Sequence, residues 1–148
     1  MVMFEAGALS VACIVLLVLL QFEMIGWLWR FNLERGSSNR VKIALSVSCL
    51  IGTHLLQVAV FALGYLIGER VLNLGTVAAS HWIGMRDVFY YSAEVFSTLG
   101  LGDVYATSDL RMLTAIESLS GMLLLSWSAS FIVIAVQHAG SANQDPQR

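Results

Sequence analysis

The sequence predicts an all-α membrane protein with three transmembrane helices and a re-entrant segment between the second and the third. The chain has 148 residues, of which 57% are hydrophobic and only 12% are charged, whereas soluble domains carry about 25% charged residues. Three apolar runs reach the length of about 20 residues that a helix needs to cross the hydrocarbon core. A further amphipathic segment is about half as long and continues into glycine-rich sequence.

The first two apolar runs are joined by a basic connector. Residues 6–29 form the first run, and because Glu5 but no Lys or Arg precedes it, we interpret it as a retained helix rather than a secretory signal peptide. Residues 30–42 follow with four cations and one acid, and the positive-inside tendency places this connector in the cytoplasm. Since the second run covers residues 43–67, we expect an extra N-terminal helix with its loop at 1–40.

A third run, residues 112–136, places the two termini on opposite sides of the membrane. With the connector in the cytoplasm, the N-terminus is expected outside and the C-terminus inside, in a multi-pass protein of the plasma membrane. Residues 138–148 are small and polar and include the only proline, Pro146. They are expected to form a disordered cytoplasmic tail.

The re-entrant segment is predicted from a short helix followed by irregular backbone. Residues 87–97 begin with an acid, Asp87, which is favourable at a helix N-terminus, and Val88, Tyr91 and Val95 recur at helical spacing. The helix is too short to span. Irregular backbone at membrane depth is tolerated only where protein or a water-filled cavity surrounds it.

Glycine stands at every second position of the hexapeptide 98–103, T-L-G-L-G-D. Glycine takes positive φ at low steric cost, so the backbone can turn successive carbonyls toward one side. A ring of such carbonyls from four subunits can replace the hydration shell of a cation. The alternative for this pattern alone is a tight glycine turn that joins two helices.

The order of half-length helix, glycine-rich strand and spanning helix resembles the pore module of the potassium-channel superfamily, in its bacterial two-transmembrane form. The family filter reads T-V-G-Y-G-D, and the likeness covers roughly residues 41–137. Further matches are the pore-helix glutamate, the filter aspartate, an aromatic pair, and an arginine and a glycine of the inner helix. These are Glu94, Asp103, Tyr90, Tyr91, Arg111 and Gly121.

The resemblance implies a homotetramer in the lipid bilayer, with K⁺ ions in the filter and no organic cofactor. The ions would bind at the carbonyls of Thr98, Leu99, Gly100 and Leu101, and the filter would be supported by Gly102, Asp103, Glu94, Tyr90 and Tyr91. Gly121 would be a hinge, and the cavity and gate would be lined by Met122, Ser126, Ala129, Ser130 and Val133. Leu101 replaces the family's tyrosine, so a looser filter is expected.

Ionisable residues within apolar segments are costly unless paired, so each needs a partner. We expect Glu94 to share a hydrogen bond or a proton with Asp103, with a water-facing carboxyl as the alternative. Glu117 is expected to accept hydrogen bonds from Ser118, Ser120 or a neighbouring helix. His54, on one face with Gln57, is expected to be an interhelical hydrogen-bond partner rather than a proton sensor.

These observations together favour a tetrameric cation channel that conducts potassium. No nucleophile, metal cluster or phosphate loop is visible in the sequence, which argues against an enzyme. A net charge of −2 gives no basis for binding nucleic acid. The alternatives are a weakly selective channel for K⁺ and Na⁺, and a non-conducting membrane scaffold or accessory subunit.

Overall fold

The computed structural model describes residues 2–34, 40–80 and 83–142. Their helices and strands are α1 (Val2–Trp29), a π-helical turn η1 (Arg30–Glu34), α2 (Arg40–Arg70), β1 (Val77–Ala79), α3 (Met85–Phe96), β2 (Val104–Ala106) and α4 (Leu110–Ala142). The chain is mainly helical, as predicted, and the two strands of three residues each were not expected.

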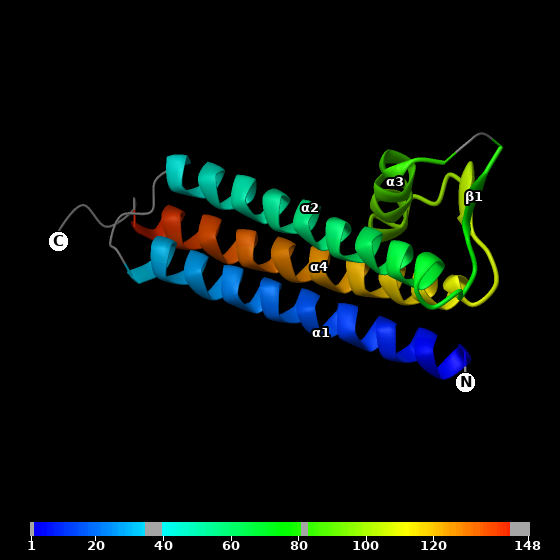
Figure 1. The fold of residues 1–148 in the computed structure, drawn as a ribbon. Coiled ribbons are helices and arrows are strands. Elements are labelled where there is room, and N and C mark those ends of the chain that lie inside the picture. Colours follow the sequence, from blue (N-terminus) through cyan, green and yellow to red (C-terminus); the bar gives the residue numbers. More distant parts are fainter. Residues whose placement is uncertain (1, 35–39, 81–82, 143–148) are drawn as a thin grey trace.

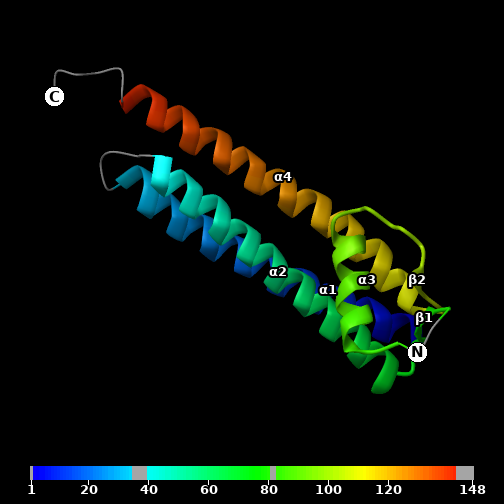
Figure 2. The ribbon, with the colours of Figure 1, turned by 90° about the horizontal axis from the view of Figure 1, so that it is seen from above.

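Three long helices run side by side along the length of the molecule, with the start of α1 and the end of α4 at opposite ends (Figure 1). Phe4–Asn32, Arg40–Arg70 and Leu110–Ala139 are each long and apolar enough to cross a membrane. The prediction of three spans is therefore confirmed. Helix α3 and both strands lie at one end, and the end of α1 and the start of α2 lie at the other (Figures 1 and 2).

Helix α3 is the half-length helix that the sequence indicated. It has 12 residues, which corresponds to about 18 Å at 1.5 Å per residue. The backbone N–H of Gly84 donates to Oδ2 of Asp87 at 2.7 Å, so the acid at the start of the helix satisfies a backbone donor there. The buried side chains of Val88, Tyr91 and Val95 share one face, and this face packs into the main core.

Strands β1 and β2 pair antiparallel, with Val77 opposite Ala106. The pairing continues at Thr76 and Thr107: the Thr107 N–H donates to the Thr76 carbonyl at 2.9 Å, and the Thr76 N–H donates to Oγ1 of Thr107 at 2.9 Å. Helix α3 and the hexapeptide lie between the two strands in sequence. This two-stranded sheet therefore joins the beginning of the re-entrant segment to its end.

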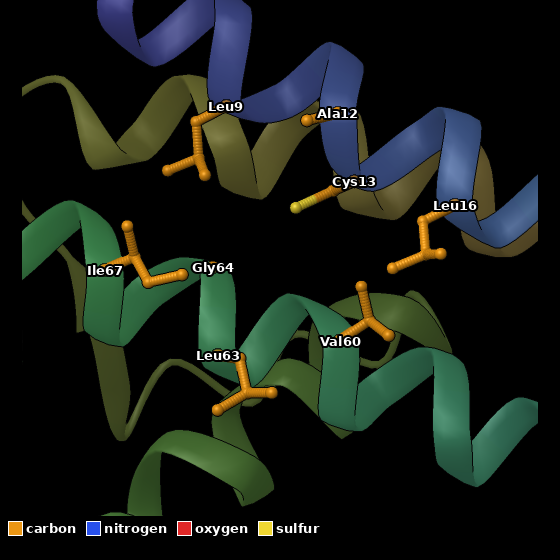
Figure 3. A pocket seen from close by; sticks show the side chains of 8 residues that line it. All are labelled: Leu9, Ala12, Cys13, Leu16, Val60, Leu63, Gly64 and Ile67. Carbon is orange, nitrogen blue, oxygen red and sulfur yellow. The ribbon is translucent and has the colours of Figure 1, made fainter.

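Helix α1 packs against α2 through small residues. A Cβ atom on Gly64 would lie 3.1 Å from Sγ of Cys13, so glycine permits the close approach of these helices. Figure 3 shows the Cys13 side chain directed toward α2 beside an apolar hollow of about 260 Å³. Both cysteines of the chain, Cys13 and Cys49, are free thiols.

Two expectations about the end of the molecule opposite to α3 need correction. Helix α4 continues through Ala142, so disorder from residue 138 onward is wrong for residues 138–142; alanines favour helix there, and no proline occurs before Pro146. Part of the connector 30–42 is also helical, because Arg30–Glu34 and the start of α2 are ordered turns. Residues 143–148 of the expected tail lie outside the described residues.

Candidate ion-conducting site

The backbone of the hexapeptide alternates in conformation. Thr98, Gly100 and Gly102 have φ of 60°, 56° and 81°, so every second residue lies in the left-handed region. Two of the three are glycine, which adopts this region without strain. This is the alternation that the spacing of the glycines indicated.

The carbonyl groups of residues 98–102 have no hydrogen-bond partner in the part of the chain that the structure describes. Among the described residues, no hydrogen bond ends on any of these five oxygens. The Leu99 and Leu101 side chains beside them are 63% and 60% exposed. The segment therefore offers a row of free backbone oxygens, flanked by apolar side chains that this chain does not cover.

Glu94 connects α3 to this segment through both its backbone and its side chain. Its backbone carbonyl accepts from the Leu99 N–H at 2.8 Å, and Oε2 accepts from the Leu101 N–H at 3.3 Å. Burial raises the pKa of this carboxyl, the bond from Leu101 opposes that effect, and the charge of Asp103 adds to it. Glu94 thus holds the hexapeptide to α3 through the N–H groups of Leu99 and Leu101.

The expected bond between Glu94 and Asp103 is not found in the part of the chain that the structure describes. Asp103 instead accepts from the Tyr90 hydroxyl at 3.4 Å. The two carboxyls contact different partners because one bonds inward to the Leu101 N–H and the other lies on the exposed side of the segment. Their interaction is electrostatic only.

Tyr90 and Tyr91, predicted as a pair, lie in different environments. Tyr90 is 39% exposed, and its hydroxyl donates to Oδ1 of Asp103. Tyr91 is buried, and its hydroxyl pairs with Oγ1 of Thr114 at 2.8 Å and accepts from the Ala106 N–H at 3.2 Å. The side chains of successive helix residues point about 100° apart. Tyr91 therefore faces the core, and Tyr90 faces outward.

Glu117 lies at the centre of a buried polar cluster that joins α2, α3 and α4. Its side chain is 0% exposed. The Tyr65 hydroxyl donates to Oε2 at 2.6 Å, and the Ser92 hydroxyl lies 2.5 Å from Oε1. The expectation of a neighbouring helix as partner is confirmed, whereas Ser120 bonds to its own helix, at the carbonyl of Ile116.

A second polar cluster joins the N-terminal helix to the other two spans. Gln21 on α1 donates to Oγ of Ser128 on α4 at 2.7 Å, and Gln57 on α2 donates to Oε1 of Gln21 at 3.1 Å. His54 contacts Oε1 of Gln57 at 2.8 Å and Oγ of Ser128 at 3.0 Å. His54 is therefore an interhelical hydrogen-bond partner, as expected.

Gly121 has a packing role in the structure. A Cβ atom there would lie 2.1 Å from the carbonyl oxygen of Phe96, so the backbones of α4 and the end of α3 are in close contact. Glycine is required at this crossing whether or not the helix also bends there. The hinge role remains a prediction.

The remaining candidate residues lie along one stretch of α4. Each is exposed in the single chain, and their spacing places them toward one side of the helix. They are Met122, Ser126, Ala129, Ser130 and Val133. Other apolar side chains of α4, such as Leu123, are exposed as well, so exposure alone does not assign these five to a cavity.

Sequence reasoning missed Tyr65, Ser92 and Gln21. A signal was present for the last two, because a polar residue within an apolar helix usually faces protein. Tyr65 is fully buried, and its hydroxyl has an acceptor in Glu117.

The three spans, the half-length helix and the glycine-rich strand define a multi-pass membrane protein of the pore-loop class. A family model described as "Ion channel" matches residues 49–138, and the chain belongs to this family. The match includes most of the second span, the re-entrant segment and most of α4. No curated protein and no solved structure matches the chain.

Proposed function

We propose that the chain assembles as a homotetrameric channel that conducts potassium through the carbonyls of residues 98–101. The observation that carries this proposal is the row of unpartnered oxygens on a backbone of alternating φ. Four such strands around an axis provide carbonyl rings that replace the water of a desolvated cation. Because one chain supplies one strand, cyclic fourfold symmetry follows.

The apolar side chains beside the strand support assembly. Leu99, Leu101 and Tyr105 are each more than half exposed in the single chain. Exposed apolar groups that cluster in this way mark contact surfaces. In a tetramer, neighbouring subunits would cover them and hold the strands around the axis.

The distribution of basic residues supports an orientation with the strand at the outer face. The start of α2, which contains Arg40 and Lys42, lies at the end of the bundle opposite to α3 (Figure 1), and Arg30 directly follows α1. Cations are enriched on the cytoplasmic side. The N-terminus is then outside and the C-terminus inside. Ions that leave the filter would enter a cavity lined from α4 by the candidates from Met122 to Val133.

A channel of weak selectivity is a second candidate, favoured by Leu101. A leucine side chain makes no hydrogen bond, so nothing at this position ties the strand to the surrounding helices as a phenol would. At this position the bond to the surrounding helices that the described residues show is that of the Leu101 N–H to Oε2 of Glu94.

Purified protein in liposomes under K⁺ and Na⁺ gradients tests the proposal. Selective conduction predicts a reversal potential close to that of K⁺, and weak selectivity predicts a value near zero. Asp103→Asn should alter conduction without loss of the folded protein. A monomer without ion flux would refute the channel and favour a scaffold subunit.

A further inference from the structure

Among the described residues, no hydrogen bond joins the cluster around Glu117 to residues 98–103, the filter strand. The cluster does hold helix α3, which is bonded to that strand. Ser92 and Glu94 are two residues apart on α3 and face different partners. Ser92 bonds to α2 and α4, and Glu94 bonds to the filter strand. A change in the position of α3 therefore moves the carboxyl that accepts from the Leu101 N–H.

The hydrogen bonds of Glu117 fix the position of helix α3 relative to α2 and α4. Tyr65, Ser92 and Glu117 are each 0% exposed, and they come from three different helices. In surroundings of low dielectric, a satisfied polar network is strong and a broken one is costly. The carboxyl thus fixes the rear of α3 against both spans of the pore domain.

We propose that Glu117, through Ser92 and Tyr65, is a positioning residue for the filter, and that ion selectivity depends on its hydrogen bonds. The inference rests on the proposed function. A tyrosine at position 101 would hold the filter strand rigid through its hydroxyl. In this chain we assign that task to the buried hydrogen bonds of Glu117, which hold helix α3 behind the strand. Glu117 does not meet the ions.

The number of hydrogens available at Ser92 shows which substitution of Glu117 keeps its hydrogen bonds. The Ser92 hydroxyl has one hydrogen but two acceptors in range, the Val58 carbonyl at 2.8 Å and Oε1 of Glu117. Both contacts are satisfied when a hydrogen on the residue at 117 points to the serine oxygen. A glutamine amide always offers that hydrogen, and its carbonyl still accepts from Tyr65.

Selectivity of the reconstituted channel, measured as the Na⁺ to K⁺ permeability ratio, tests this inference. Glu117→Ala should raise the ratio at least about fivefold, the equivalent of one ordinary hydrogen bond, and Glu117→Gln should keep it near wild type. Ser120→Ala is the matched control, because Ser120 lies on the same helix and bonds only to its own backbone.

If Glu117→Ala does not assemble, Ser92→Ala and Tyr65→Phe remove the same contacts one at a time and should each raise the ratio. In a double-mutant cycle the effects of Ser92→Ala and Glu117→Ala should not add. A selective wild type with an unchanged ratio in these variants, or a loss in Glu117→Gln equal to that in Glu117→Ala, overturns this inference alone. A wild type without selective flux overturns the proposed function and this inference with it.

Discussion

Replacement of Gly121 by alanine tests the contact between α4 and the end of α3. The added Cβ would lie 2.1 Å from the Phe96 carbonyl oxygen and 2.9 Å from its carbonyl carbon. Non-bonded carbon contacts have their optimum at about 3.5–4.0 Å, so the two backbones must separate by about 1 Å or more. The obstacle is backbone and cannot rotate away. Overpacking of this kind costs about 1–3 kcal/mol.

Unfolding of the purified protein in a detergent titration measures the loss, with the K⁺ flux of the same sample as a second readout. Gly52→Ala is the matched control, since a Cβ there meets nothing within 4 Å and alanine favours helix by about 1 kcal/mol. Gly121→Ala should be less stable than wild type and Gly52→Ala should not. If Gly121→Ala is as stable as wild type and changes only the open probability, Gly121 acts as a hinge and the packing argument is refuted.

Three further predictions concern other parts of the chain. Ser128→Ala removes the acceptor of Gln21 and should destabilise the protein by about 1–3 kcal/mol in the same titration, because a buried amide loses its partner. Since burial raises the pKa of Glu94, its ionisation costs stability as the pH rises; the melting temperature of wild type should fall relative to that of Glu94→Gln as the pH rises above the ordinary glutamate pKa of about 4.3. Gly75→Ala places a Cβ 2.3 Å from the Thr107 carbonyl oxygen at a φ of 144°. The substitution should therefore weaken the pairing of β1 and β2 and accelerate hydrogen exchange of their backbone amides.

Each of these has a control or a contrary result. Ser48→Ala controls for Ser128→Ala, because Ser48 is exposed and bonds to the carbonyl of Ala44 in its own helix; equal effects would refute the interhelical role of Ser128. A constant difference between wild type and Glu94→Gln at all pH values would show that Glu94 does not titrate as described. Unchanged exchange in Gly75→Ala would mean that the turn tolerates a side chain.

The sequence predicted the features that depend on local pattern. Three apolar runs and the half-length helix follow from hydropathy and helical spacing alone, and the backbone alternation follows from Gly100 and Gly102. Helix ends were less accurate, because nothing in residues 138–142 stops a helix and the expected disorder rested on polarity alone.

The features that depend on tertiary contacts were not predicted. Strands β1 and β2 are three residues each and pair across the whole re-entrant segment, so neither has a periodic pattern of its own. The partner of Glu117 was expected on a neighbouring helix, but sequence spacing could not indicate Ser92 or Tyr65. Asp103 illustrates the opposite error: it is close to Glu94 in sequence, yet its hydrogen bond is to Tyr90.

The two-stranded sheet of β1 and β2 limits the chain entropy of the re-entrant segment. Its two strands clamp the ends of a loop of about 30 residues, and closing such a loop costs about 3 kcal/mol of chain entropy once. The pairing that closes this loop runs from Thr76 and Thr107 to Ala79 and Val104. Helix α3 and the glycine-rich strand are therefore tied at both ends by the same short sheet, in addition to the bonds that Ser92 of α3 makes with α2 and α4.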